Sequence, residues 1–286
     1  MAKTKIMKRI FLICLVFSLL APSSGATIFK WKKAEMDGSR TGVVTAGPDN
    51  VDETMGRIVR GKYIAPNGKE FKKNSSTAKV AKLMIDVQPS MAFVKELVGH
   101  SAREMKKHSP ESELTNWVID MLMEETGRLT EQNIDLGITN FGGIRVDMPS
   151  GDVLYDDLQS MFPFNNTLCC VKLKGSDVRR IFERMASTSV QVVGGVRIVV
   201  KDRKLQSILV GGEPLDDNRI YNLATISFLL NGGDGLNLAQ NAIEVVDTQV
   251  NIFDAVINHV REMTNRGEVI EYEMDGRVQI IGDRRR

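Results

Sequence analysis

The sequence has 286 residues, of which 42% are hydrophobic and 26% are charged, which fits one globular domain with at most a small appendage. The formal net charge is +2, and it falls by four, to −2, once the basic N-terminal segment is removed. A nearly neutral chain of this kind argues against nucleic acid as a partner.

The N-terminus has the pattern of a cleaved signal peptide. Four basic residues lie within the first nine positions, an apolar run covers residues 10–20, and small residues follow at 21–26. The run is too short to span a bilayer comfortably, and no second long run exists. We therefore expect a signal peptide over residues 1–26, no transmembrane segment in the mature chain, and export to the periplasm or the medium. An uncleaved membrane anchor is the alternative.

Residues 27–77 are polar and predict a small β-rich arm or linker. Turn signals such as Gly47-Pro48 and Pro66-Asn67-Gly68 separate short strand-like pieces, for example 41–44 and 56–63.

From Thr77 the pattern becomes helical, with apolar residues at helical spacing from Val80 to Val98 around a break at Pro89. A second helix is predicted over residues 113–126, ended by Gly127. A buried strand over 134–138 then leads into a glycine-rich turn.

The rest of the chain alternates strands and helices. The predicted strands are 168–173, 191–200, 206–210 and 221–225, and the predicted helices are 155–161, 176–185, 236–241 and 252–264. Gly211-Gly212 and Asp275-Gly276 indicate hairpin-type turns. The sequence thus predicts an α+β domain over residues 78–286, with a mixed β-sheet flanked by helices.

The first segment suited to ligand binding directly follows the predicted strand 134–138. Gly142 and Gly143 let the backbone approach a ligand and expose its amides. Asn140 offers a donor and an acceptor, which suits a nucleobase edge, and the Arg145 guanidinium suits phosphate or ribose oxygens. A glycine turn with a surface arginine is the alternative.

The second segment is Phe162-Pro163-Phe164-Asn165-Asn166. Pro163 fixes the backbone where the chain leaves a predicted helix, so the Phe164 ring could offer its face to a purine. The same ring could equally fill the core.

The third segment surrounds Asp234 with three glycines, one of which is Gly233. A carboxylate accepts hydrogen bonds from two neighbouring hydroxyls, which is a common way to bind ribose. Phe228 supplies a second ring, and Asn231 belongs to the same candidate site. The alternatives are an N-cap for the next helix and a calcium-type loop, which needs more oxygen ligands than are present.

The three segments together resemble the C-terminal domain of the 5'-nucleotidase family. Asn-x-Gly-Gly-x-Arg, Pro-Phe-x-Asn and Asn-Gly-Gly-Asp-Gly occur in the family's order, and the likeness runs from about Val98 to the C-terminus. Family proteins carry a two-metal phosphoesterase domain first and this domain second, and they cut nucleoside monophosphates or related esters.

The resemblance implies roles for five side chains. Phe164 and Phe228 would sandwich the base, and Asp234 would bind the ribose hydroxyls. Asn140 would meet the base edge or the ribose, and Arg145 would hold the ribose-phosphate end. One departure is Pro110, which stands near the place of a usual family arginine, while Glu113 and Asn116 match the family as structural residues.

The metal-binding motifs of the two-metal phosphoesterases do not occur in this sequence. His100, His108 and His259 are solitary, and each fits a surface or capping role better than a ligand role. We therefore predict no catalytic residue, no metal ligand and no cofactor in this chain. The divalent metals are expected on a partner metallophosphatase chain.

The resulting hypothesis is a nucleoside- or nucleotide-recognition component of a 5'-nucleotidase-type hydrolase, in nucleotide catabolism. It would work with a separate metallophosphoesterase-domain protein. Two alternatives remain: an exported nucleoside- or nucleotide-binding protein without a hydrolytic role, and a degenerate domain kept for protein–protein contact.

Overall fold

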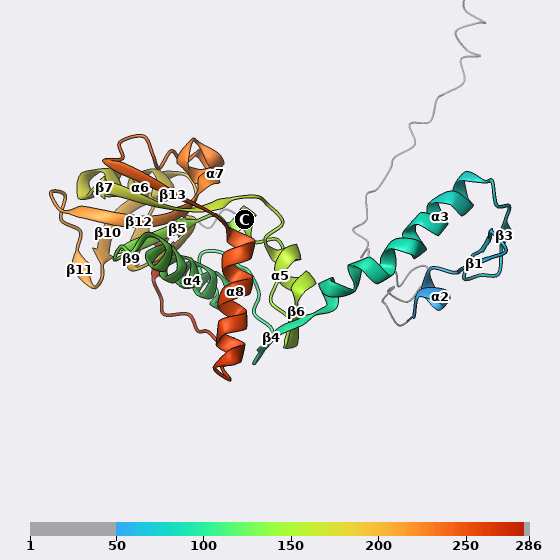
Figure 1. The fold of residues 1–286 in the computed structure, drawn as a ribbon. Helices are drawn as coiled ribbons and strands as arrows, with labels where there is room; N and C mark the ends of the chain where they lie inside the picture. The colour runs from blue at the N-terminus through green and yellow to red at the C-terminus, as the bar shows by residue number, and fades with distance from the viewer. Residues whose placement is uncertain (1–49, 283–286) are drawn as a thin grey trace, which may run out of the picture. The chain divides into compact units, whose positions relative to one another are not determined.

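The computed structural model describes residues 50–282. The predicted signal peptide 1–26 and the predicted strand 41–44 lie outside these residues. The chain divides into two compact units between Ile85 and Asp86 (Figure 1). The domain limits suggested by the sequence, at 26/27 and 77/78, stay predictions.

The described part of the N-terminal unit contains a short antiparallel sheet in the order β1-β2-β3. Its elements are α2 (Val51–Thr54), β1 (Arg57–Val59), β2 (Lys62–Ile64) and β3 (Glu70–Phe71). The prediction of one strand over 56–63 is wrong. Arg60 and Gly61 both have positive φ, 49° and 77°, so they turn the chain into a two-residue hairpin.

The helical pattern that starts at Thr77 is confirmed only in part. Helix α3 spans Ser76–Val87 and is followed by the 3-10 helix η3 (Gln88–Lys95). Its predicted continuation to Val98 is wrong, because β4 (Leu97–Ser101) pairs with β6 (Gly151–Leu154) instead. Val98 is buried on that strand, so its apolar side chain belongs to the buried face of a sheet and not to a helix.

A five-stranded sheet forms the centre of the C-terminal unit, in the order β13-β7-β12-β5-β8. The strands are β5 (Leu136–Thr139), β7 (Thr167–Lys174), β8 (Val192–Gly194), β12 (Ile220–Ile226) and β13 (Glu244–Asn251). Only β12 and β5 are parallel, and the other neighbours are antiparallel. The sheet is therefore mixed, as the sequence predicts.

A second mixed sheet has the order β11-β10-β9-β14. Its strands are β9 (Val196–Lys201), β10 (Lys204–Val210), β11 (Glu213–Pro214) and β14 (Val278–Ile281). The single strand predicted over 191–200 is wrong, because the chain passes from β8 in one sheet to β9 in the other at Gly195. This residue has a φ of 68°, and a Cβ there would lie 2.4 Å from the Asp135 carbonyl oxygen.

The two predicted hairpin turns have different outcomes. Gly211-Gly212 joins the antiparallel strands β10 and β11, as predicted. Asp275-Gly276 does not join paired strands, because it leads into β14, which runs parallel to β9. That prediction is wrong.

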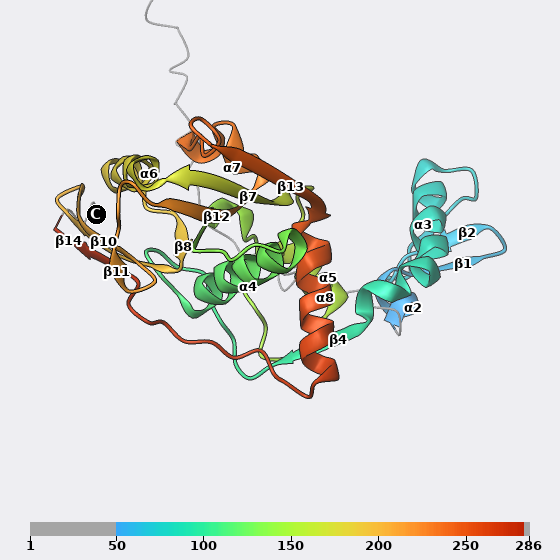
Figure 2. The ribbon, with the colours of Figure 1, turned by 60° about the vertical axis from the view of Figure 1, so that its left-hand side comes forward.

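Helices cover the sheets of the C-terminal unit (Figure 2). They are α4 (Glu113–Thr130), α5 (Tyr155–Met161), α6 (Gly175–Ser187), α7 (Ser227–Leu230) and α8 (Ile252–Asn265). Helix α4 packs on the five-stranded sheet, and α6 packs against β10 and β7. Helix α4 starts in a capping box between Ser112 and Thr115. Its predicted end at Gly127 is wrong, because the helix runs to Thr130 and Glu131 caps it in the left-handed conformation.

The helix predicted over 236–241 is wrong. The short 3-10 helix η5 (Gly233–Gly235) stands before that stretch, which forms turns. Leu236 and Leu238 are both buried while the intervening Asn237 is exposed, so the alternation does not fit a helix.

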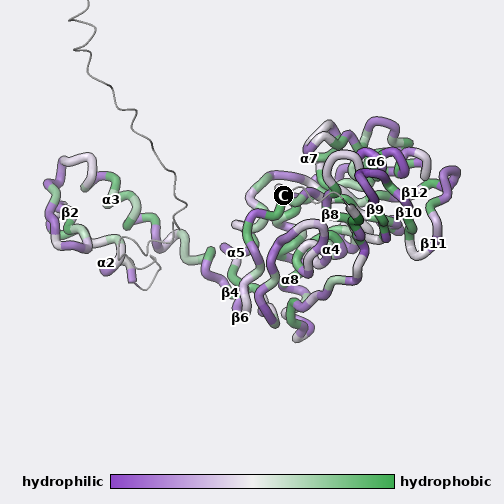
Figure 3. Tube along the Cα trace, turned by 180° about the vertical axis from the view of Figure 1, so that it is seen from behind, coloured by the Kyte–Doolittle hydropathy of each residue, from purple (hydrophilic) through white to green (hydrophobic). Residues whose placement is uncertain are grey.

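The hydrophobic core of the C-terminal unit is continuous between the two sheets and α4, α6 and α8. Figure 3 shows green, apolar stretches among the strands and purple, polar stretches on α6 and the loops. This core supports the sheet edge from which the candidate ligand loops emerge.

Candidate functional site

Two loops emerge side by side from one edge of the five-stranded sheet. The first loop (residues 140–145, with the 3-10 turn η4 at Phe141–Gly143) follows β5. The second loop (residues 228–235, which include the rest of the one-turn helix α7 after Ser227 and the 3-10 turn η5) follows β12. Strands β5 and β12 are parallel neighbours, so their carboxyl ends lie at the same edge. The topology therefore brings together two motifs that are about ninety residues apart in the sequence.

A side-chain hydrogen bond joins the two loops. Asn140 donates from Nδ2 to Asp234 Oδ2 over 2.6 Å. Asn140 is buried and Asp234 is exposed. The side-chain amide of Asn140 therefore holds Asp234 Oδ2 from the protein side. Gly143 allows this arrangement, because a Cβ at that position would lie 2.6 Å from Asn140 Oδ1.

The second loop has a backbone that glycine makes possible. Gly232 and Gly235 have φ values of 101° and 73°, and Asp234 itself is left-handed at φ 49° and ψ 28°. Two main-chain bonds close the turn, from Gly235 to Gly232 and from Leu236 to Gly233. Asp234 is thereby presented at the tip of the loop.

Both predicted aromatic residues are half exposed. Phe164 and Phe228 each have 45% of their surface accessible, so neither ring fills the core. The Arg145 guanidinium carbon lies 5.9 Å from the centroid of the Phe164 ring, within range of a cation–π contact. Phe228 lies against Gly233, where a Cβ would come within 2.7 Å of the ring.

The segment that carries Phe164 reaches the same edge through β7. The start of β7 pairs with the end of β12, and Thr167 donates its main-chain N–H to Ser227 Oγ over 3.0 Å. All nine predicted residues thus come from segments that meet at this edge: Asn140, Gly142, Gly143, Arg145, Phe164, Phe228, Asn231, Gly233 and Asp234. Asn231 lies in the second loop, exposed at the end of α7.

Three residues outside the motifs also hold the loops. Lys107 donates from Nζ to the carbonyl oxygens of Ile144 and Phe141, over 2.5 and 3.2 Å. Gln191 Oε1 accepts from the Phe141 main-chain N–H, and Arg184 Nε donates to the Gly235 carbonyl over 2.7 Å. Sequence reasoning missed these roles, because contacts to main-chain groups leave no side-chain motif.

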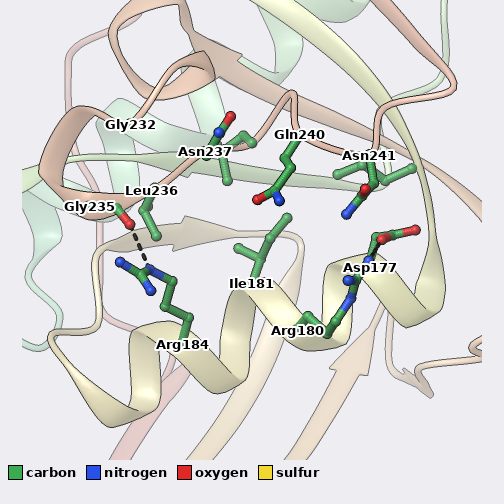
Figure 4. A pocket seen from close by; sticks show the side chains of 12 residues that line it. Asp177, Arg180, Ile181, Arg184, Gly232, Gly235, Leu236, Asn237, Gln240 and Asn241 are labelled. Atoms are coloured by element: carbon green, nitrogen blue, oxygen red, sulfur yellow. Dashed lines mark hydrogen bonds and ion pairs between the residues drawn. The ribbon is translucent and has the colours of Figure 1, made fainter.

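A pocket of about 530 Å³ lies between α6 and residues 232–241 (Figure 4). Polar side chains at its rim include Asp177, Arg180 and Arg184, and Ile181 and Leu236 contribute apolar surface. The pocket borders the second loop through Gly232 and Gly235, and the predicted aromatic residues do not line it.

Two of the three histidines each lie beside a single carboxylate. His259 Nδ1 lies 3.0 Å from Glu125 Oε1 between α8 and α4, and His100 faces Asp152 at the surface. The capping or surface role predicted for His259 is therefore too simple, because its side chain is only 11% exposed. Within residues 50–282, no three His, Cys, Asp or Glu side chains gather in a way that would hold a metal ion.

The helices that the structure describes are too short or too polar to cross a lipid bilayer.

Comparison with known proteins identifies the domain. The family described as "5'-nucleotidase, C-terminal domain" matches residues 90–241, more than half of the chain. Protein UshA from Yersinia enterocolitica is 28% identical over 192 residues, which cover 65% of this chain and 33% of that protein. A 5'-nucleotidase from Rattus norvegicus is 26% identical over 195 residues, which cover 59% of this chain and 33% of the relative.

Solved structures show the same fold. A 5'-nucleotidase precursor from Thermus thermophilus superposes with a TM-score of 0.63 at 24% identity, covering 72% of this chain and 43% of that one. The chain spans about a third of the length of the two curated relatives named above.

Proposed function

Because this chain belongs to the 5'-nucleotidase C-terminal domain family, we propose that it recognises the nucleoside or nucleotide for a 5'-nucleotidase-type phosphoester hydrolase. It would serve nucleotide catabolism, and its working site would lie at the sheet edge that carries the first and second loops.

The observation that carries this proposal is the hydrogen bond between Asn140 and Asp234. It holds one carboxylate oxygen in place, and no described residue donates to the other oxygen, Oδ1. A carboxylate in this state can accept from the two adjacent hydroxyls of a ribose.

The surrounding groups suit the other parts of a nucleotide. Phe164 and Phe228 offer exposed rings on which a base can stack. Arg145 is exposed beside Phe164 and carries a permanent positive charge, which suits the ribose-phosphate end. Gly142 and Gly143 leave room for a ligand to approach the first loop.

The divalent metals of the reaction would come from a partner metallophosphatase. We assign this chain no step of phosphate hydrolysis, because its sequence lacks the metal-binding motifs of the two-metal phosphoesterases. Its contribution would be to orient the substrate, which can lower an activation barrier by several kcal/mol. Export to the periplasm or the medium, directed by residues 1–26, is part of the same proposal.

Calorimetric titration of the mature chain (residues 27–286) with adenosine and AMP tests the proposal. We expect measurable binding, and we expect Phe228→Ala to weaken it by about 5- to 150-fold, as loss of one stacking contact does. Phe93→Ala is the matched control, because Phe93 is similarly exposed at 49% but lies outside both loops. Affinity should be unchanged in that variant.

Two other results would change the conclusion. No binding of either ligand at millimolar concentration contradicts recognition by this chain. Submicromolar binding would favour the alternative of a nucleoside-binding protein without a hydrolytic role, since an open half-site should bind weakly.

A further inference from the structure

We propose that Arg184, which lies on α6 outside both loops, is a positioning residue that holds Asp234 in place and thereby sets the preference of the site for ribose hydroxyls. The inference rests on the proposed function, because it takes Asp234 as the ribose-binding group.

The contact that motivates the proposal is direct. Arg184 Nε donates to the carbonyl oxygen of Gly235, the residue after Asp234, over 2.7 Å. Figure 4 shows the side chain rising from α6 to this carbonyl. Arg184 Nη2 also lies 3.6 Å from where a Gly235 Cβ would stand, so the guanidinium rests against the loop itself.

The second loop needs an external support of this kind. Asp234 has a left-handed backbone, which is unfavourable for a residue with a Cβ, and it lies between Gly232 and Gly235, both at positive φ. Such a loop has many alternative conformations open to it. Besides Asn140 on the Asp234 carboxylate, Arg184 is the described side chain that donates to this turn.

Helix α6 gives Arg184 a firm base. Val178, Phe182 and Met185 are buried in the core on the opposite face of the helix, so the position of the helix is set by packing. The Arg184 guanidinium therefore holds the Gly235 carbonyl at a fixed position relative to α6. Because Asp234 directly precedes Gly235, this bond also restricts the position of Asp234.

The same helix offers a matched control. Arg180 lies one turn earlier and lines the same pocket, but it pairs with the Asp177 carboxylate and not with the loop. Replacing Arg180 removes the same charge from the same pocket without removing the bond to Gly235. A general electrostatic effect should therefore appear in both variants, and a positioning effect only in Arg184→Ala.

The test compares adenosine with 2',3'-dideoxyadenosine by calorimetric titration. In the wild-type chain adenosine should bind more tightly, because only it offers both hydroxyls to Asp234. Arg184→Ala should weaken adenosine binding about tenfold while dideoxyadenosine binding stays the same, as loss of one charge-assisted hydrogen bond suggests. Arg184→Lys should recover part of the preference, since an ammonium can also donate to the carbonyl. Arg180→Ala should behave as wild type.

A second measurement does not depend on ligand binding. Amide hydrogen exchange of Gly235 and Leu236, whose N–H groups close the turn, should be faster in Arg184→Ala than in Arg180→Ala. If the wild type binds adenosine and Arg184→Ala keeps the full preference over dideoxyadenosine, the inference is overturned. If the wild type binds neither nucleoside, the proposed function fails, and unchanged exchange in Arg184→Ala would separately overturn the role of Arg184 in holding the loop.

Discussion

Two polar clusters of the C-terminal unit differ in how many of their carboxylate oxygens accept hydrogen bonds from described residues. The Arg277 cluster consists of Asp120, Tyr272, Asp275 and Arg277. Arg277 is 6% exposed, and its guanidinium donates to Asp120 from both Nη atoms and to Asp275 from Nε. Tyr272 adds a bond from its hydroxyl to Asp120 Oδ2 over 2.5 Å.

The pair formed by Asn140 and Asp234 is the opposite case. Asp234 is exposed, and in the described part of the chain only one of its carboxylate oxygens accepts a hydrogen bond. Both carboxylate oxygens of Asp120 accept from the buried Arg277, whereas only one oxygen of the exposed Asp234 accepts from a described residue. This comparison separates a structural network from a candidate binding site without reference to motifs.

Electrostatics agree with the structural role of the Arg277 cluster. Burial alone would lower the pKa of Arg277, but its bonds to Asp120 and Asp275 raise the pKa above the ordinary arginine value. The guanidinium is therefore charged at all accessible pH values. Its buried charge is stabilised by the carboxylates of Asp120 and Asp275.

The largest effect is expected from Asp120→Ala. This variant leaves the buried Arg277 charge without its two-oxygen partner, so the free energy of unfolding should fall by about 3 kcal/mol. Urea denaturation measures the change. Glu183→Ala, an exposed acid on α6, should change stability by less than about 0.5 kcal/mol. Equal effects of the two variants would show that the Arg277 cluster is not structural.

Gly143→Ala should be the next most damaging change. The added Cβ would lie 2.6 Å from Asn140 Oδ1, so Asn140 must move and its bond to Asp234 should weaken. We expect a loss of about 1–3 kcal/mol in unfolding free energy, as for other overpacked sites. Gly142→Ala is the control, because its nearest contact would be 3.3 Å away. Thermal unfolding of both variants measures the loss of stability. A larger loss in Gly142→Ala than in Gly143→Ala would contradict this prediction.

Asp234→Asn should affect binding more than stability. The amide keeps the shape of the side chain but replaces charge-assisted bonds by neutral ones, which should weaken adenosine binding by about tenfold. Because Asp234 is exposed, unfolding free energy should stay within about 0.5 kcal/mol of wild type. Calorimetry with 2',3'-dideoxyadenosine supplies the control, and an equal loss for this ligand would argue against ribose as the partner of Asp234.

The smallest effect is expected from Tyr272→Phe, at about 1 kcal/mol, because Asp120 keeps both bonds from Arg277. The pH dependence is the more specific readout. Burial, followed by the hydrogen bond and the charge of Asp120, raises the pKa of Tyr272. Its contribution is then fully present below the ordinary tyrosine pKa of about 10 and is lost as pH rises through the folded value.

Urea titrations between pH 8 and 11 should therefore show a decline in wild-type stability that is reduced in Tyr272→Phe. Parallel curves for the two proteins would exclude the Tyr272–Asp120 bond as the source of the decline.

Much of the fold could be predicted from local pattern. The helices α4, α6 and α8 and the strands β7, β10 and β12 carry apolar residues at the spacing of their own elements. Strand β13 was not predicted, because it is an edge strand whose residues are at most half-buried. The helix predicted over 236–241 does not form, because burial alternates between Leu236, Asn237 and Leu238, a pattern that no helical face has.

The sequence by itself identified the family and marked three motifs whose glycine, aromatic and carboxylate residues suit a nucleotide, and their role in recognition stays a prediction. Only the tertiary structure decided that β5 and β12 are parallel neighbours, that Asn140 bonds Asp234, and that Arg184 and Lys107 support the two loops. The physical reason is that these contacts join residues tens of positions apart, often through main-chain carbonyls that every residue type possesses, so no local pattern can mark them.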